Sequence, residues 1–284
     1  MQHNLLFILN KLCLDWLALF GIIVSRYFLI CGITYLLFYS ALIRYIAKVN
    51  LISKSISWKI IKKDMELSLL CAMIFAFCAA LVITAYDLGF TRLYTSINQY
   101  GLWYLGVSFI TLLILQDTYF YFMHRLFHHP LLFKKLHYGH HRSKVPTPWT
   151  SFAFDPVEAF IQALFFVCIV FILPLHYIPL ITALIVMTVW AVFNHIGFEL
   201  FPPSFYSNSL GKFFIGSKHH LIHHRKYNLH YGLYFTFWDK LLGTEDGDYD
   251  NQMYSTVKYS ILGEKLLIKN RRDAESAEEI VRER

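Results

Sequence analysis

Residues 102–129 have the sequence LWYLGVSFITLLILQDTYFYFMHRLFHH, an apolar stretch that ends in closely spaced histidines. A transmembrane helix needs about 20 mainly apolar residues, and residues 102–122 supply them. His124 and His128 follow, and side chains at positions i and i+4 lie on one face of a helix. The stretch therefore predicts a membrane-spanning helix that presents two imidazoles to one metal ion where it leaves the membrane.

The composition of the whole chain is that of an integral membrane protein. Of its 284 residues, 56% are hydrophobic and 18% aromatic, and the mean hydropathy is +0.44. A soluble domain of this size needs less apolar surface. Further apolar stretches at 27–46, 67–86, 157–173 and 177–193 predict four to five spans, the last two forming a hairpin. Residues 5–24 contain Lys11 and Asp15, so they either lie along the interface or form an imperfect span.

These stretches predict a single all-α domain, a helical membrane bundle with a cytoplasmic helical cap. We expect N-terminal membrane helices in residues 1–99, a region that contains the closely spaced histidines in 100–245 and a solvated tail in 246–284. Basic residues gather at Arg44, Lys48, Lys54, Lys59, Lys62 and Lys63, and again at Arg125, Lys134, Lys135, Arg142 and Lys144. The loop 87–99 contains a single basic residue, Arg92. By the positive-inside rule, the two basic clusters and the region after residue 195 face the cytoplasm.

The net charge of +7 does not indicate a nucleic-acid partner. The basic residues flank apolar spans instead of forming a separate basic domain, which favours contact with anionic lipid headgroups. The five cysteines all lie within apolar stretches and lack the paired spacing of a zinc site or a disulfide framework. We expect them to be small buried hydrophobic residues.

Three histidine clusters predict a metal centre. The motif H-x-x-H-H occurs twice, at His137, His140 and His141 and again at His220, His223 and His224. In each motif the spacing of three and four residues predicts three imidazoles on one helical face. His124, His128 and the isolated His195 complete a set of nine. A single zinc site uses about four ligands, so nine histidines suit two ions better than one.

Acidic residues near these motifs allow several interpretations. Asp117 lies seven residues before His124 and is expected to accept the N–H of a ligand histidine, although a helix-packing hydrogen bond is the alternative. Asp155, Pro156 and Glu158 fit a helix start with a capping box better than a ligand set. Glu199 lies four residues after His195 and could orient that ring. His129, His219 and His230 adjoin the motifs but do not fit their spacing.

These residues, in this order, resemble the fatty acid hydroxylase / sterol desaturase superfamily. The resemblance is carried by D117-TYFYFM-H124-RLF-H128, by H137-YG-H140-H141 with Pro146-Thr147-Pro148, by H220-LI-H223-H224, and by Tyr231-Gly232 with WDKLLGT at 238–244. It covers roughly residues 100–245. Outside the boxes, Asp155 and His230 replace the His and Asn of many relatives.

The resemblance implies a non-haem di-iron membrane enzyme that uses dioxygen to hydroxylate or desaturate a lipid. Zinc has no redox chemistry, whereas an imidazole-rich site beside lipid tails suits iron. No GxGxxG motif or haem attachment motif is present, so electrons from NAD(P)H must come through a separate cytoplasmic electron-transfer protein. Four basic residues could meet an acidic carrier: Arg142, Lys144, Lys212 and Lys218.

Other function classes remain as alternatives. A membrane metal transporter or metal-binding protein would place histidines along a path through the membrane, whereas here they follow the ends of spans. A dimetal hydrolase and a purely structural membrane protein come after it. Sterol and fatty acyl substrates both suit an apolar pocket, and hydroxylation and desaturation can share the step of hydrogen abstraction.

Overall fold

The computed structural model describes residues 2–41, 57–201 and 203–249. The described chain is mostly helical, which confirms the predicted fold class. The predicted tail 246–284 lies almost entirely outside the described residues.

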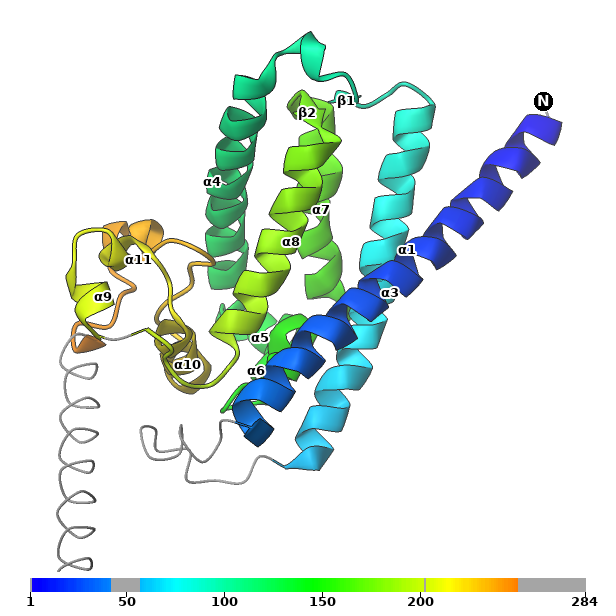
Figure 1. Cartoon of the computed structure of the whole chain (residues 1–284). Coiled ribbons are helices and arrows are strands. Elements are labelled where there is room, and N and C mark those ends of the chain that lie inside the picture. The colour runs from blue at the N-terminus through cyan, green and yellow to red at the C-terminus, as the bar shows by residue number, and fades with distance from the viewer. Residues whose placement is uncertain (1, 42–56, 202, 250–284) are drawn as a thin grey trace, which may run out of the picture.

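Within the described residues, four helices are long and apolar enough to cross a membrane (Figure 1). They are α1 (Gln2–Leu36), α3 (Trp58–Asp87), α4 (Leu102–Phe127) and α8 (Tyr177–Asn194). The α7 helix (Pro156–Ile172) is apolar but shorter, with 17 residues. It forms the predicted hairpin with α8, and a short strand, β2 (Leu175–His176), lies at the turn between them.

The N-terminal region differs from the prediction, which treated residues 5–24 and 27–46 as separate segments. The structure has one continuous helix, α1, which a short π-helical segment, η1 (Leu37–Ala41), extends. No proline interrupts residues 2–41. Lys11 forms ion pairs with Asp15 at 2.7 Å and with Asp87 at 2.6 Å, which reduces the cost of placing these charges near lipid. At 1.5 Å per residue, α1 is about 50 Å long, longer than the hydrocarbon layer is thick.

The outer faces of the bundle are apolar. On α1, large side chains such as Leu6, Phe7, Leu14 and Leu29 are more than half exposed. An exposed apolar face of this length suits contact with acyl chains rather than water. Two of the five cysteines, Cys13 and Cys168, also lie on exposed faces, so the expectation that all five are buried was wrong.

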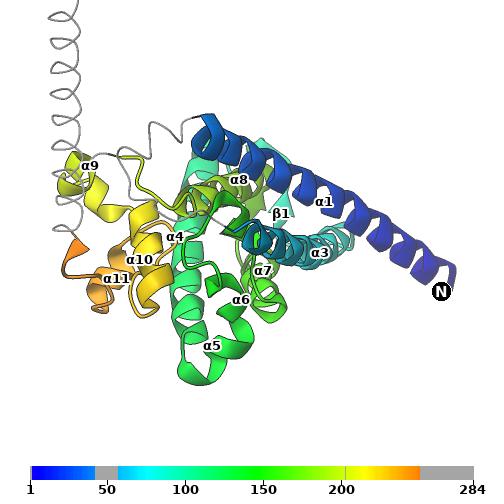
Figure 2. The ribbon, with the colours of Figure 1, turned by 90° about the horizontal axis from the view of Figure 1, so that it is seen from below.

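The two ends of the bundle have different structures. At one end, β1 (Leu93–Tyr94) pairs in parallel with β2, with Leu93 opposite Leu175, and the short helix η2 (Ile97–Gln99) leads into α4. At the other end lie the short elements that carry most of the histidines: α5 (Pro130–Leu136), α6 (Tyr138–His141), η3 (Pro148–Phe152), α9 (Pro203–Ser207), η4 (Gly211–Phe213), α10 (Ser217–Lys226) and α11 (Phe237–Leu241). Figure 2 views the molecule from this end.

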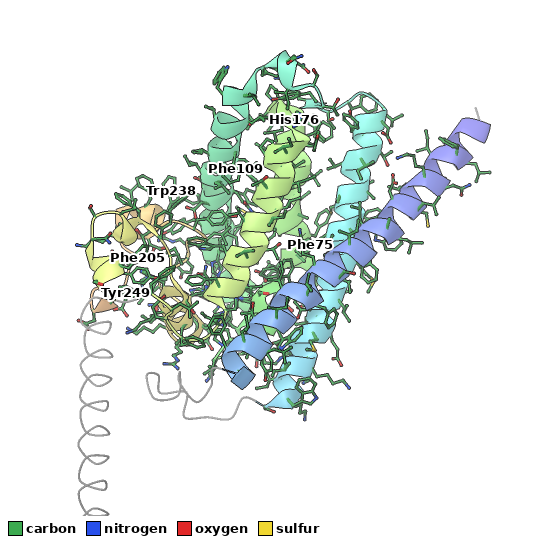
Figure 3. The ribbon with its side chains drawn as sticks, viewed as in Figure 1. Phe75, Phe109, His176, Phe205, Trp238 and Tyr249 are labelled. Carbon is green, nitrogen blue, oxygen red and sulfur yellow. The ribbon has the colours of Figure 1, made fainter. Side chains whose placement is uncertain are left out.

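The segment between α6 and α7 is fixed to the first two membrane helices. The Tyr27 hydroxyl on α1 donates to the Trp149 carbonyl at 2.8 Å. On α3, buried Asp64 accepts hydrogen bonds from the hydroxyls of Ser143 at 2.6 Å and Thr150 at 2.8 Å. Tyr27, Trp149 and Phe152 belong to one buried apolar cluster, and Phe75 packs against it (Figure 3). The N-terminal helices therefore hold the second histidine motif in place.

Candidate metal centre

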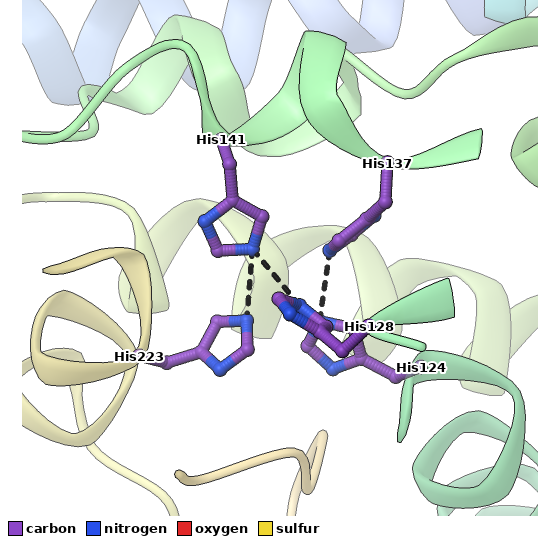
Figure 4. A group of neighbouring side chains, drawn as sticks. All are labelled: His124, His128, His137, His141 and His223. Atoms are coloured by element: carbon purple, nitrogen blue, oxygen red, sulfur yellow. Dashed lines mark hydrogen bonds between the residues drawn. The ribbon is translucent and has the colours of Figure 1, made fainter. Parts of the chain in front are cut away.

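The structure brings the nine predicted histidines together in two groups. We call His124, His128, His137, His141 and His223 the five-histidine set (Figure 4), and His140, His195, His220 and His224 the four-histidine set. Within each set, one ligand atom from every residue lies within 4.8 Å of all the others. Among the described residues, both sets consist of histidines alone. All nine rings are buried except that of His128, which is half-buried.

Each H-x-x-H-H motif divides between the two sets. His137 and His141 enter the five-histidine set while His140 enters the other, and His220 and His224 enter the four-histidine set while His223 enters the first. The prediction of three imidazoles on one face was therefore wrong. Successive residues on a helix are about 100° apart, so positions i and i+4 share a face while i+3 lies to its side. One motif thus contributes to both sets.

The helix is interrupted within the motif His137–His141, and local structure explains why. His137 ends α5 and precedes the single turn of α6, and its φ of −144° lies outside the helical region. The Gly139 amide donates to Asp155 Oδ2 at 2.8 Å. A Cβ at position 139 would lie 2.5 Å from Asp155 Oδ1, so a larger residue would displace the carboxylate that accepts from this amide.

The Nδ1 atoms of five of the histidines lie beside acceptors. Four lie beside backbone carbonyls: His124 beside Tyr231 at 3.0 Å, His140 beside Ala153 at 3.3 Å, His195 beside Ala191 at 2.6 Å, and His223 beside Leu229 at 2.7 Å. The fifth, His137, lies 2.7 Å from Glu158 Oε2. An imidazole whose Nδ1–H donates to an acceptor carries a lone pair on Nε2 when it is neutral. The backbone thus selects the tautomer that can bind a metal.

The Nε2 atoms point toward one another at short range. In the five-histidine set, Nε2 of His124 and His137 are 3.1 Å apart, and that of His141 is 3.0 Å from His223. In the four-histidine set, Nε2 of His195 is 3.3 Å from His140 and 3.0 Å from His220. Two lone pairs cannot share a hydrogen bond. A first-row metal ion binds imidazole at about 2.1 Å, so two ligands at right angles around it lie about 3 Å apart. The donor set and its spacing fit a metal ion in each set.

Burial also favours the neutral rings that metals bind. Desolvation holds the pKa of His137, His140 and His141 well below the usual histidine range, and does the same for His220, His223 and His224. It lowers the pKa of His195 to about 4. Neighbouring imidazoles lower the pKa of the six further, since two protonated rings would repel.

Glu158 is a residue whose function the sequence interpretation missed. Asp155 does begin α7, but its side chain makes no capping hydrogen bond, so the expected capping box does not form. Instead, Glu158 is 1% exposed and bonds to His137 as described above. A carboxylate behind a ligand histidine fixes the ring and strengthens it as a donor. Because the spacing of Asp155, Pro156 and Glu158 fits a helix start, the sequence analysis did not predict the contact between Glu158 and His137.

Asp117 does not occupy the predicted position behind a ligand histidine. Its Oδ1 accepts hydrogen bonds from the backbone amides of Leu233, Tyr234 and Phe235, at 2.7 Å for Tyr234. No hydrogen bond in the described part of the chain joins it to a histidine. Asp117 instead fixes the 233–235 loop, which continues from the Tyr231 carbonyl beside His124.

Asp239 completes the support of that loop. Its carboxylate accepts from the amides of Tyr231 at 2.8 Å and Gly232 at 2.9 Å, and from the hydroxyl of Thr244 at 2.7 Å. A Cβ on Gly232 would lie 2.5 Å from the Phe235 carbonyl oxygen. The Tyr231-Gly232 and WDKLLGT segments therefore hold the carbonyl that orients His124.

The remaining candidates lie outside both sets. His219 accepts from the Gly216 amide and stacks on Tyr249, with ring centroids 3.8 Å apart. His230 accepts from the Asp246 amide at 3.2 Å, and His129 caps α5. Glu199 does not orient His195, because it accepts hydrogen bonds from the Tyr206 hydroxyl and from backbone amides, including that of Lys218.

The sequence model of the family described as Fatty acid hydroxylase matches residues 109–244, which include all nine histidines. This match confirms the resemblance inferred from the motifs.

Two relatives show what the chain is similar to. Lathosterol oxidase of Homo sapiens is 37% identical over 158 residues, which cover 55% of this chain and 51% of the relative. A Delta(7)-sterol 5(6)-desaturase of Gibberella zeae is 32% identical over 156 residues, which cover 55% of this chain and 47% of the relative. The chain thus spans about half the length of the curated relatives it matches. No solved structure matches it.

Proposed function

We propose that the protein is a membrane di-iron oxidoreductase that uses dioxygen and external electrons to hydroxylate or desaturate a lipid. The division of nine histidines into two buried sets, with Nε2 atoms 3.0–3.3 Å apart, is the observation that carries this proposal. The sterol desaturases among its relatives favour a sterol or a similarly apolar lipid as substrate.

Bound iron would supply the redox chemistry that activates dioxygen, and the chain's own residues define where that chemistry occurs. The five- and four-histidine sets would each hold one ion, and their burial keeps bulk water away from it. Hydroxylation converts C–H to C–OH and releases one water, whereas desaturation removes two hydrogens and releases two waters. Both reactions consume one O₂, two electrons and two protons.

The electrons require a partner protein. Lys144 and Lys212 are exposed at the histidine end of the bundle, whereas Arg142 is half-buried with its guanidinium 3.7 Å from Asp64. We propose that the two lysines guide an acidic electron-transfer protein that is reduced by NAD(P)H. The double variant Lys144→Glu/Lys212→Glu should slow turnover with that carrier but not with a small chemical reductant. As the control, Lys134→Glu should leave both rates unchanged.

We also propose that the histidine end faces the cytoplasm. Lys59, Lys62 and Lys63 begin α3 at this end, and Lys134 and Lys135 lie on α5 nearby. A single cysteine introduced at position 134 of a cysteine-free protein should react with an impermeant maleimide only after the cytoplasmic face is opened. Labelling from the outer face of intact cells would contradict this orientation.

The purified full-length protein gives the decisive test. We expect about two irons per chain and oxygen consumption that depends on both lipid and reductant. Metal flux across vesicles without oxygen uptake would favour a transporter and overturn the proposal. Mass spectrometry of lipids from cells with and without the gene then identifies the substrate by its lost hydrogens or its added oxygen.

A further inference from the structure

A cavity lies at the end of the bundle opposite the histidines. It has a volume of about 430 Å³, and its polar lining includes Thr91, Arg92, Tyr94, Ser96 and Gln99. Leu93 and Tyr94 of β1 also line it, together with Pro174, which precedes β2. From Gly101 to His124, α4 rises by about 34 Å at 1.5 Å per residue. The cavity is therefore separate from the metal centre.

The backbone that carries the polar residues is held firmly. The Arg92 amide donates to the Val170 carbonyl at 2.8 Å, and the Arg92 carbonyl accepts from the Leu175 amide. His176 uses both ring nitrogens: Nε2 lies 2.8 Å from the Thr95 carbonyl, and Nδ1 accepts from the Ile178 amide. Both backbone polar groups of Arg92 are therefore occupied, and its side chain is free to contact a ligand.

Two hydrogen-bond donors at this cavity lack partners within the described chain. The Arg92 guanidinium is exposed and forms no ion pair there, while the nearby Asp87 is paired with Lys11. The Tyr94 side chain is 6% exposed, and its buried hydroxyl has no hydrogen-bond partner. A buried hydroxyl without a partner is costly, and a cation beside it favours an anionic acceptor.

The surroundings place this cavity at the membrane surface. Exposed aromatic side chains surround it, with Tyr86 39%, Tyr100 38% and Trp103 70% exposed. Tyrosine and tryptophan concentrate at the headgroup level of membranes. Phe90 and Leu102 are more than two-thirds exposed beside them and can contact acyl chains.

We propose that this cavity binds the phosphate of a lipid headgroup, with Arg92 and Tyr94 as its donors. Arginine is suited to a phosphate because its planar N–H groups pair with two oxygens. A single exposed arginine holds a free anion weakly in water, whereas the acyl chains of a phospholipid add apolar contact with the neighbouring residues. The bound lipid would belong to the leaflet opposite the metal centre.

Native mass spectrometry of the full-length protein in detergent tests this proposal. We expect dioleoyl-phosphatidylglycerol to be retained, and dioleoylglycerol, which has the same chains without the phosphate, to be lost. Arg92→Gln should weaken phosphatidylglycerol binding about tenfold, as the loss of a charge-assisted hydrogen bond implies. Arg225→Gln removes an exposed basic residue of α10, at the other end of the bundle, and should leave binding unchanged.

Three results would overturn the proposal. They are equal retention by Arg92→Gln and the unaltered protein, equal retention of both lipids, and displacement of the lipid by millimolar inorganic phosphate, which would indicate a site for the free anion. Tyr94→Phe removes one oxygen and provides the test if Arg92→Gln does not fold, with binding expected to weaken about threefold. Lipid retention is measured without turnover, so the result does not depend on the proposed enzymatic function.

Discussion

The two histidine sets present the same nitrogen to a metal but differ in number and in support. The five-histidine set has one ring to spare beyond a four-coordinate site, and its His137 is backed by the Glu158 carboxylate. In the four-histidine set, the observed partners of His140 and His195 are neutral carbonyls. A carboxylate that accepts the Nδ1–H of an imidazole makes Nε2 of that ring a stronger electron donor to a metal ion. The two ions would therefore be chemically unequal, with the more electron-rich ion in the five-histidine set.

The largest effect should come from removing a ligand that has no substitute. His220→Gln leaves three histidines in the four-histidine set, so it should abolish turnover and release the ion held there. His219→Gln is the matched control, because His219 is the adjacent buried ring and lies outside both sets. Metal content by plasma mass spectrometry and oxygen uptake should separate the two variants. Equal metal content in both would show that His220 is not a ligand.

The spare ring of the five-histidine set gives the next largest contrast. His128 is half-buried in a set of five, whereas His195 is buried in a set of four. His195→Ala should lower the metal content to about one ion per chain, while His128→Ala should retain most of both ions, since four ligands suffice for one. Turnover should fall in both variants. A larger metal loss in His128→Ala would reverse the proposed ranking of the sets.

Glu158→Gln removes the charge that distinguishes the sets. The glutamine retains an acceptor for the His137 N–H but not the negative charge, so metal affinity should fall by about 10- to 100-fold. The loss should be confined to one ion of the two. Glu66→Gln provides the control, because Glu66 is exposed on α3 and distant in sequence from every histidine motif. Metal affinity can be measured by competition with a chelator, and unchanged affinity in Glu158→Gln would remove the asymmetry.

The proposed ligand histidines were easier to predict from the sequence than the groups that orient them. Histidine spacing and apolar length are local patterns. They predicted the nine clustered rings, the helices α3, α4 and α8, and the α7–α8 hairpin, but not the continuous helix α1. Helical geometry separates the rings of each H-x-x-H-H motif, but which rings from different motifs meet in one set depends on how α4, α6, α8 and α10 are placed, and no local pattern contains this. Four of the groups behind the rings are backbone carbonyls, which any residue type provides. Residues 5–24 were a doubtful span because they contain Lys11 and Asp15. These two residues pair with each other, and the second partner of Lys11, Asp87, is distant in sequence.

The smallest effect should come from Asp117, which acts on His124 only through a loop. Asp117→Asn keeps an oxygen that can accept from the 233–235 amides but removes its charge, which should cost about 1 kcal/mol of stability. The loop carries the carbonyl that orients His124, so the turnover rate should fall more than the metal content does. Asp117→Ala removes the acceptor and should lower the thermal midpoint further, with both ions still bound. If Asp117→Asn lost metal as readily as Glu158→Gln, the carboxylate would act on the ligands directly, and the contrast between the two acids would disappear.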